Sequence, residues 1–360
     1  MRVTCVVRRY YHHTESGGYD RLAEAVGANV IVRKQISGLF GKGAAKIWWH
    51  LTPMKDNLID YQFGDWLAEL QALACGFFRP PDVLHVLYNG SIDLLIKWRN
   101  LLRCPLVVTF HAPFKNLAHR FDAYPKGLGI DIAVVVATSQ ILPMQRWIAP
   151  SKIVYIPHGI DTDRFRPSDQ ISGAGKMRVL IVGEHMRDWL VIHRTVDEIN
   201  NRGLDVEFHV VTNERLFPYL TGCANLTYHS QVSENELIDL YRSADVLFLP
   251  VTDATANNSI LESLACGTPV ISTMVGGIPD YVNDESGWLF PVGDVARHVD
   301  LITLLHGNRD LARARRQVAR THALKFDWRV VAEQVVAAYA ACSPAIAAAR
   351  QKRAPTIIDP

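Results

Sequence analysis

Short runs of aliphatic and β-branched residues alternate along the chain with segments of helical period, such as Tyr19–Val26 and Glu234–Arg242. This alternation is typical of α/β folds, in which helices connect the buried strands of a parallel sheet. The runs predicted as strands in the first half are Val3–Arg8, Asn29–Arg33, Val83–Leu87, Leu106–Phe110, Ile132–Ala137 and Lys152–Ile156. Those in the second half are Arg178–Val182, Val206–Val211, Leu226–Tyr228, Val246–Leu249, Val270–Ser272 and Trp288–Phe290.

A polar, glycine-containing stretch at 168–176 separates the two series and is predicted to be a linker. The pattern therefore predicts an N-terminal Rossmann-like domain at 1–166, a C-terminal Rossmann-like domain at 167–345 and a tail at 346–360. The segment Trp328–Ala341 has apolar residues at core-facing helical spacing, so we expect this terminal helix to pack back on a domain. At about 150 residues per domain, 360 residues also favour two domains.

Composition narrows the class of protein. A hydrophobic content of 49% with 21% charged residues is that of a globular chain and excludes a disordered or fibrous one. The longest apolar runs are far shorter than the roughly 20 residues of a membrane helix, and the N-terminus does not resemble a signal peptide. The six cysteines form no C-x-x-C pair. We therefore expect a cytoplasmic protein with no nucleic-acid partner.

Charge is distributed unevenly between the two halves. Residues 1–166 carry 20 Lys and Arg against 13 Asp and Glu, a net charge of +7, and residues 167–360 carry 18 against 23, a net charge of −5. The first half is therefore suited to an anionic partner.

The most informative motif runs from Asp253 to Pro279 and is predicted to form a loop, a helix, a strand and a glycine-rich loop. Backbone amides at Asn257, Asn258 and Ser259 would lie at the start of the helix, where an anion binds, and the turn at Gly276 and Gly277 would bring further donors close. A diphosphate suits such a site. Glu262, one turn into the helix, could accept hydrogen bonds from two neighbouring hydroxyl groups, as on a ribose.

With this motif the chain resembles the family 4 glycosyltransferases, retaining enzymes of the GT-B fold that use nucleotide-diphosphate sugars. The residues that carry the resemblance are Glu15-Ser16-Gly17-Gly18, Val107–His111, Ile156–Asp161 with Phe165, and Leu261–Val270. The resemblance implies two Rossmann-like domains facing each other across a cleft and closing about the segment Ile156–Asp163. It also implies that Glu262 holds the ribose and that Asn257, Asn258 and Ser259 hold phosphate and donor sugar.

The chain departs from that family at two positions. The first glutamate of the family's E-x7-E element is replaced by Ala254, and Asp253 is the nearest carboxylate. Glu184 stands where an arginine is usual, and Arg187 is the nearest substitute. A guanidinium there could neutralise a leaving diphosphate in place of a metal ion.

In the first half, His111 ends a predicted strand, at the edge where parallel sheets bind ligands. The resemblance gives it contact with the donor or its phosphate. Gly17 and Gly18 precede the first helix, so their backbone could approach a phosphate or an acceptor closely. His13 lies in the same loop and is a further candidate for acceptor contact.

No metal site and no cofactor other than the nucleotide-sugar co-substrate are expected. Asp161-Thr162-Asp163 matches the D-x-D metal motif of another glycosyltransferase fold, but no strand end surrounds it and we interpret it as a coincidence. The segment containing Trp48 and Trp49 is apolar and basic, as in a surface that contacts an anionic membrane beside a lipid-linked acceptor; the alternative is a helix whose tryptophans pack inward.

The sequence thus predicts a hexosyltransferase that uses a UDP- or GDP-linked sugar and a hydroxyl acceptor on a glycan, a lipid-linked or a small molecule. Two alternatives stay open. A nucleotide-sugar epimerase of similar fold would need no acceptor. A non-catalytic nucleotide- or sugar-binding protein would explain Ala254 and Glu184.

Overall fold

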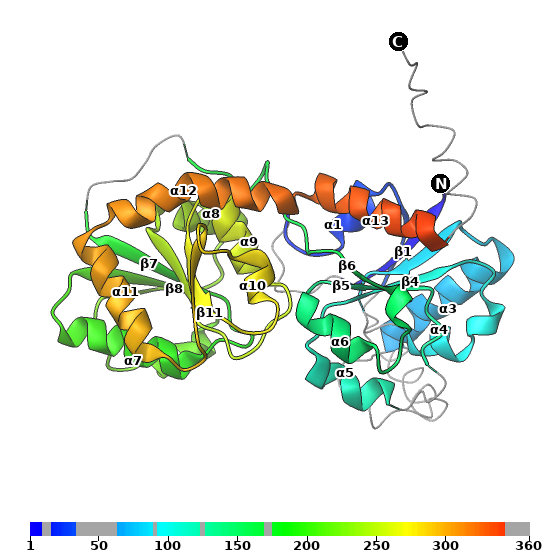
Figure 1. Ribbon diagram of the computed structural model, residues 1–360, viewed down its shortest axis with the longest axis horizontal. Helices are drawn as coiled ribbons and strands as arrows, with labels where there is room; N and C mark the ends of the chain where they lie inside the picture. The colour runs from blue at the N-terminus through cyan, green and yellow to red at the C-terminus, as the bar shows by residue number, and fades with distance from the viewer. Residues whose placement is uncertain (9–15, 34–62, 89–91, 123–126, 169–174, 343–360) are drawn as a thin grey trace, which may run out of the picture. The chain divides into compact units, whose positions relative to one another are not determined.

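The computed structural model describes residues 1–8, 16–33, 63–88, 92–122, 127–168 and 175–342 (Figure 1). The chain divides into two compact units. The first comprises residues 1–13, 19–157 and 329–360, and the second comprises residues 14–18 and 158–328. Each unit is an α/β structure built on its own parallel sheet, as the strand and helix pattern predicts.

The first sheet has the strand order β2-β1-β3-β4-β5-β6, and all its neighbouring strands are parallel. β1, β3, β4 and β5 are buried along their whole length, which explains why most of their successive residues are apolar instead of alternating with polar ones. The strands are β1 (Val3–Val7), β2 (Asn29–Val32), β3 (Val83–Val86), β4 (Leu106–Phe110), β5 (Ile132–Val135) and β6 (Ile153–Tyr155).

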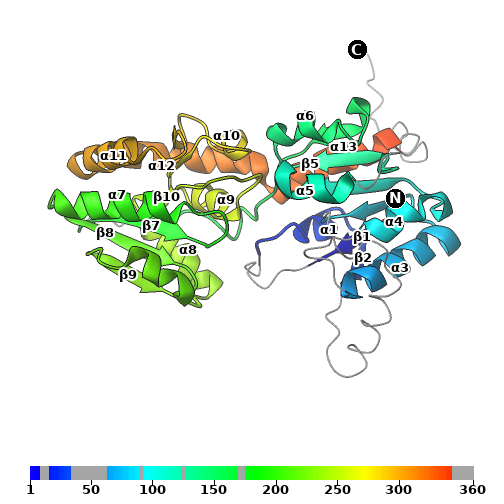
Figure 2. The same cartoon turned by 90° about the horizontal axis from the view of Figure 1, so that it is seen from below.

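Two sets of helices cover the first sheet (Figure 1). One face packs against apolar side chains of α3, α4, α5 and α6, and α3 and α4 lie side by side on it (Figure 2). On the other face, Tyr339 of the C-terminal helix α13 reaches His85 of β3. The helices are α1 (Arg21–Ala25), α3 (Phe63–Phe78), α4 (Asp93–Lys97), α5 (Phe114–Phe121), α6 (Ile141–Met144) and α13 (Trp328–Cys342), with 3-10 turns η2 (Arg99–Leu101), η3 (Thr138–Gln140) and η4 (Pro150–Lys152).

The second sheet has the order β12-β11-β10-β7-β8-β9 and is also parallel throughout. Its strands are β7 (Met177–Val182), β8 (Val206–Val211), β9 (Leu226–His229), β10 (Val246–Leu249), β11 (Val270–Thr273) and β12 (Gly287–Phe290). Each of the twelve strand predictions is confirmed within two residues at either end.

Helices on both faces bury this second sheet. Side chains of α7 and α11 form one core with it, and side chains of α8, α9, α10 and α12 form the other. The helices are α7 (Trp189–Asn201), α8 (Glu234–Ser243), α9 (Asn258–Ala265), α10 (Ile278–Tyr281), α11 (Val295–Gly307) and α12 (Asp310–Ala323), with 3-10 turns η5 (Glu214–Leu220) and η6 (Leu324–Phe326). Among the described helices, none has the length and apolar content needed to cross a membrane.

The boundaries of the compact units differ from the domain limits expected from sequence. The chain passes from the first to the second unit at 157/158 rather than at 166/167, because Phe165 and its neighbours pack in the core of the second unit. Helix α13, expected within the second domain, belongs to the first unit from Arg329 onwards, where Tyr339 provides the contact with the sheet. Residues 169–174 of the expected linker lie outside the described residues.

Candidate functional site

The loop between β10 and α9 forms the centre of the candidate site in the second unit. Asn257 precedes α9 in an extended conformation, and its side-chain oxygen accepts a hydrogen bond from the backbone amide of Ile260 at 3.3 Å. This is a helix N-cap. The amides of Asn258 and Ser259 fall in the first helical turn, where a helix offers no carbonyl partner of its own and anions are stabilised. Helix α9 thus starts where the sequence predicts it, and the asparagine side chain provides its cap.

Glu262 lies one turn into α9 with only 4% of its surface exposed. The hydroxyl of Tyr241, from α8, donates to its Oε2 at 2.9 Å. Burial together with the negative charge of Glu262 raises the pKa of Tyr241 well above its ordinary value, so the phenol stays protonated and remains a donor. Tyr241 is not among the site residues predicted from the sequence. Its only signal there was an apolar position in an amphipathic helix, which gives no indication of a partner 21 residues away.

Arg187 extends from the loop after β7 toward the same helix. Its Nε and Nη1 donate to the carbonyl oxygens of Val182 and His185, each at 2.8 Å, and its Nη2 lies 3.4 Å from Ser259 Oγ. Burial lowers the pKa of Arg187 to about 10, and the charge of Glu262 opposes that shift. The guanidinium is thus charged at neutral pH and lies at the start of α9.

Gly183 is needed for this placement of Arg187. Its φ is +86°, in the region that favours glycine, and a Cβ on it would lie 2.5 Å from Nη2 of Arg187. Met186 also has a positive φ, of 56°, immediately before Arg187. The loop conformation therefore aims Arg187 at α9, a feature that residue spacing does not reveal.

The glycine turn after β11 packs directly against the loop that contains Asp253. Gly276 has a φ of +56°, and a Cβ on it would lie 2.0 Å from the carbonyl oxygen of Ala254 and 3.0 Å from Oδ1 of Asp253. The amide of Gly277 donates to the Ala254 carbonyl at 2.8 Å. Asp253 thus places a carboxylate at the glycine turn, whereas Ala254 contributes only its backbone.

Glu184 points to a different partner. Its Oε2 accepts a hydrogen bond from Nη2 of Arg215 at 2.8 Å, and Arg215 belongs to the 3-10 turn η5. The acidic residue at the position where the resemblance expects an arginine therefore forms an ion pair with an arginine from elsewhere in the same unit. Sequence reasoning did not single out Arg215.

In the first unit, His111 follows the carboxyl end of β4. Its Nε2 lies 2.9 Å from the carbonyl oxygen of Leu87, and its ring contacts the rings of Tyr19 and Tyr88, with centroid distances of 4.4 Å and 4.8 Å. The structure thus places His111 at the expected edge of the sheet, in an aromatic setting that the sequence did not predict.

The Gly17-Gly18 turn is described from Ser16 onwards. Gly18 has a φ of 122°, and Ser16, which is grouped with the second unit, donates from its amide and its hydroxyl to the carboxylate of Glu234 at 2.7 and 2.9 Å. Arg164 donates to the same carboxylate at 2.8 Å. His13 lies outside the described residues. Glu234 is therefore a further residue, missed by sequence reasoning, that fixes the segment beside the two glycines.

The D-x-D-like segment has a local structural role. Oδ1 of Asp161 accepts hydrogen bonds from the amides of Asp163 and Arg164 at 3.1 and 2.9 Å, and the Thr162 hydroxyl bonds to Asp327. In the part of the chain that the structure describes, no group of three or more His, Cys, Asp and Glu side chains is placed to hold a metal ion.

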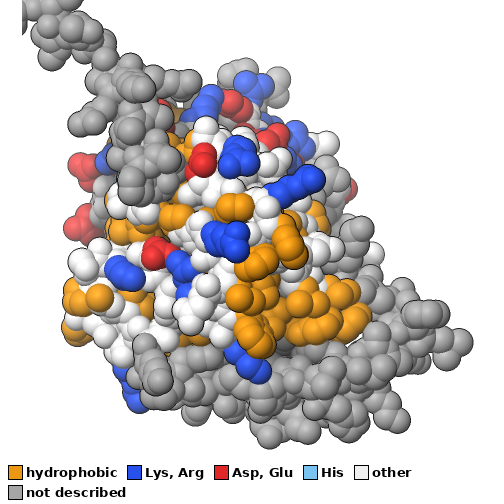
Figure 3. Space-filling view, turned by 90° about the vertical axis from the view of Figure 1, so that its right-hand side faces the viewer, with side chains coloured by type: hydrophobic (Ala, Val, Ile, Leu, Met, Phe, Trp, Pro, Cys, Tyr) orange, Lys and Arg blue, Asp and Glu red, His pale blue; other side chains and the backbone are white. Residues whose placement is uncertain are grey.

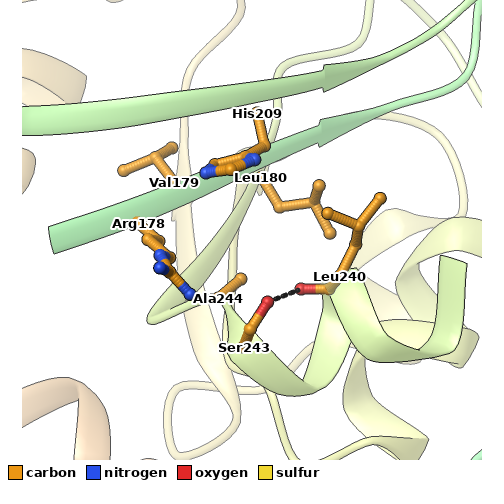
Figure 4. A pocket seen from close by; sticks show the side chains of 7 residues that line it. All are labelled: Arg178, Val179, Leu180, His209, Leu240, Ser243 and Ala244. Atoms are coloured by element: carbon orange, nitrogen blue, oxygen red, sulfur yellow. Dashed lines mark hydrogen bonds between the residues drawn. The ribbon is translucent and has the colours of Figure 1, made fainter. Parts of the chain in front are cut away.

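A small recess under the second sheet lies apart from these residues (Figure 4). It is lined by Arg178, Val179, Leu180, His209, Leu240, Ser243 and Ala244. None of the candidate site residues contributes to its lining.

The second unit matches a known protein family. Residues 176–308 match the family described as "Glycosyl transferases group 1". A curated relative, D-inositol 3-phosphate glycosyltransferase from Geodermatophilus obscurus, is 30% identical over 242 residues, which cover 59% of this chain and 52% of the relative. The chain thus spans about half the length of that relative.

Solved structures with the same architecture cover nearly the whole chain. Sucrose-phosphate synthase from Thermosynechococcus elongatus matches with a TM-score of 0.73 at 17% identity, covering 96% of this chain and 100% of its own. Alr3699/HepE from Anabaena, in complex with UDP-glucose, matches with a TM-score of 0.69 at 14% identity, covering 95% and 100%. At such low identity these likenesses establish the fold, a GT-B arrangement of two α/β units.

Proposed function

We propose that this chain is a glycosyltransferase of the GT-B fold that transfers a hexose from a nucleotide-diphosphate sugar to a hydroxyl acceptor. The match of residues 176–308 to the group 1 glycosyl transferases, the similarity to the curated relative and the fold support this proposal. Transfer proceeds with retention at the anomeric carbon and without a metal ion. The observation that carries the proposal is the meeting of Arg187, Ser259 and Glu262 at the capped start of α9. A cation, helix amides and a buried carboxylate at one helix end are the groups that a nucleoside diphosphate requires.

The donor binds to the second unit in this proposal. The first-turn amides of α9 and the guanidinium of Arg187 hold the diphosphate, and Glu262 accepts hydrogen bonds from the ribose hydroxyls. Asp253 and the turn at Gly276 hold the sugar. UDP is the first nucleotide to test, since the Anabaena structural neighbour is described in complex with UDP-glucose.

The reaction requires little from side chains beyond binding and positioning. The acceptor oxygen forms a bond to the anomeric carbon as the bond between that carbon and the phosphate oxygen breaks, and the departing phosphate takes up the acceptor proton. Arg187 stabilises the charge that develops on the diphosphate. His111 is the further residue that we propose to contact the donor or its phosphate.

An anionic small molecule is the proposed acceptor. Residues 1–166 carry a net charge of +7, from 20 Lys and Arg against 13 Asp and Glu, which favours a phosphorylated substrate. The relative from Geodermatophilus obscurus is named for inositol 3-phosphate. We therefore extend the proposal to a polyol phosphate such as an inositol phosphate.

A coupled assay tests the proposed reaction. UDP-glucose and GDP-mannose are incubated with inositol phosphate, with unphosphorylated inositol or with no acceptor, each with and without EDTA. The proposal predicts that nucleoside diphosphate is released only when acceptor is present, that EDTA has no effect, and that the product keeps the anomeric configuration of the donor. Conversion of the sugar without acceptor would instead identify an epimerase, and tight nucleotide binding without turnover would identify a binding protein.

Membrane contact is a separate part of the proposal. The segment of Trp48 and Trp49 lies outside the described residues, but apolar side chains gather beside Lys and Arg side chains on the face seen in Figure 3. Where the chain enters β3 and β4, exposed apolar residues adjoin basic ones, and we call this the Phe78 patch. It consists of Phe78, Trp98 and Leu101, which are 76%, 46% and 39% exposed, with Arg79, Lys97 and Arg103.

Local contacts hold the two chain segments of the Phe78 patch together. The guanidinium of Arg103 lies 4.3 Å from the centre of the Phe77 ring, and the Arg103 amide donates to the Gly76 carbonyl at 3.0 Å, so η2 is held against the end of α3. Aromatic residues among basic ones are suited to the interface of an anionic bilayer. The patch lies at the amino edge of the first sheet, opposite the carboxyl edge where His111 lies, so docking there leaves His111 accessible.

Vesicle sedimentation tests this contact. Wild-type protein should sediment with vesicles containing phosphatidylserine and remain in solution with pure phosphatidylcholine, and Phe78→Glu with Trp98→Glu should lose the bound fraction. Leu190→Glu, at a leucine of α7 that is 60% exposed, is the matched control. Binding that the Phe78 patch variants leave unchanged would contradict the assignment, as would concentration-dependent dimers that those variants abolish.

A further inference from the structure

The hydrogen bond of His111 defines which of its nitrogens carries a proton. Nε2 lies 2.9 Å from the carbonyl oxygen of Leu87, and a carbonyl oxygen can only accept a hydrogen bond. Nε2 is therefore the protonated nitrogen. In the neutral ring Nδ1 then carries the lone pair, and only that nitrogen can accept a hydrogen bond from a hydroxyl group or take up a proton.

Two tyrosines from different chain segments contact the His111 ring. Tyr19, directly after the Gly17-Gly18 turn, meets it nearly edge-on, at 4.4 Å between ring centroids and 74° between planes. Tyr88, just after β3, lies 4.8 Å away at 33°. Both tyrosines are buried, and the Tyr19 amide donates to the Tyr88 hydroxyl at 2.9 Å. The imidazole thus contacts two buried rings, and the backbone of Tyr19 is hydrogen-bonded to the hydroxyl of Tyr88.

A buried polar network lies under this pair. Thr109, two residues before His111 on β4, bonds through its hydroxyl to Nε2 of His85 at 2.8 Å, and Nδ1 of His85 bonds to the Tyr339 hydroxyl at 2.7 Å. Burial lowers the pKa of His85 to about 3, so this histidine is neutral at working pH and supplies one donor and one acceptor to the two hydroxyls. The strand end that carries His111 is therefore supported from β3 and from α13.

We infer that Tyr19 and Tyr88 are positioning residues for His111. Their rings hold the imidazole plane in the orientation that keeps Nε2–H on the Leu87 carbonyl, and so keep the lone pair of the neutral ring on Nδ1. Neither tyrosine touches the reacting atoms in this assignment. The inference deepens the proposed function, because the importance of the His111 orientation rests on the donor contact proposed for His111.

Nitrogen NMR on histidine-labelled protein tests the positioning directly, with His111→Gln used to assign the signals. At pH 8 the wild type should show one protonated and one unprotonated nitrogen for His111. In Tyr88→Leu the two signals should move toward each other as the second tautomer becomes populated. Tyr219→Leu, at an exposed tyrosine stacked on Trp189, should leave the His111 signals unchanged.

Tyr88→Phe keeps the test valid if Tyr88→Leu does not fold. This variant retains the ring and removes only the hydroxyl that the Tyr19 amide binds, so the two nitrogen signals should approach each other to a smaller extent. Unchanged His111 signals in the folded Tyr88 variants would overturn the inference.

Kinetics separate this inference from the proposed function. With donor and acceptor present, Tyr88→Leu should lower kcat by about 10- to 100-fold with little change in the KM of the donor, as expected for a misplaced catalytic group. If His111→Gln leaves kcat unchanged, the donor contact proposed for His111 fails, whereas the NMR result still decides the role of the tyrosines.

Discussion

At the scale of single residues, the side chains around Glu262 determine which ligand the second unit can bind. Glu262 and Arg187 carry opposite charges at the buried start of α9, and Tyr241 donates to Glu262. Replacement of Arg187 by methionine keeps the length of the side chain and removes its charge. Charge-assisted hydrogen bonds contribute about 1.5–3 kcal/mol, so Arg187→Met should weaken nucleoside diphosphate binding by about 10- to 100-fold.

Isothermal titration measures this effect, and Arg202→Met is its control, since Arg202 is an exposed arginine just after the C-terminus of α7 that pairs with Glu198 and Asp300. An equal loss of affinity in both variants would mean that the effect is general electrostatics rather than a contact at α9. The position of Arg187 itself was only approximated from sequence. Its spacing suggested a substitute for the missing arginine, but its path depends on the positive φ angles of Gly183 and Met186, which residue types alone do not fix.

At the scale of elements, the caps of two helices offer a matched comparison. Asn257 caps α9, and Asp294 caps α11 by accepting from the Arg297 amide at 3.1 Å. Loss of an N-cap costs about 1 kcal/mol, so Asn257→Ala and Asp294→Ala should lower the unfolding free energy to a similar extent. Only Asn257→Ala should also weaken nucleotide binding, as measured by titration. If both variants weakened nucleotide binding, or if neither did, the assignment of the start of α9 as the nucleotide-binding site would be wrong.

The C-terminal helix supports a second prediction at this scale. Tyr339→Phe removes the hydroxyl that bonds to buried His85 and leaves a ring nitrogen without that partner. Leaving a buried polar group unsatisfied costs about 1–3 kcal/mol, so urea unfolding should show a loss of that size. Tyr219→Phe, at an exposed position, should change little. Equal stability of Tyr339→Phe and wild type would show that the bond to His85 is not needed.

The strands were predictable because a parallel sheet buried on both faces favours continuous apolar runs, as in β5 and β10. The unit on which α13 packs was not predictable from the sequence. The apolar residues of the helix indicated a buried face, but periodicity does not say which domain receives that face, and the partner of Tyr339 lies 254 residues away. For the same reason Glu262 could be nominated from its motif, whereas its contact with Tyr241 could not.

At the scale of the whole molecule, buried histidines should make the fold sensitive to acid. Burial lowers the pKa of His85 to about 3 and that of His158 to about 4, so both are neutral in the folded units. The unfolded chain binds protons near pH 6.5, and the folded protein does not until much lower pH, so the unfolding free energy falls as pH falls through this window. As the pH falls from 7 to 5, each of these histidines should lower the unfolding free energy of the unit that contains it by about 2 kcal/mol.

Urea unfolding at pH 7 and pH 5 measures this dependence. His85→Gln should reduce the difference between the two pH values for the first unit, and His185→Gln, at an exposed loop histidine, should preserve it. Identical stability of the wild type at both pH values would contradict the prediction. Sequence could not anticipate this property, because it identifies fourteen histidines without showing which are buried.

The start of α9 in the second unit is the site proposed to bind the nucleoside diphosphate of the sugar donor. The most direct test is titration of the wild type and of Glu262→Ala with UDP, GDP, ADP, CDP and dTDP in turn. One of these nucleotides should bind the wild type, and Glu262→Ala should lose most of that affinity. Failure of all five to bind, or binding that Glu262→Ala leaves intact, would contradict it.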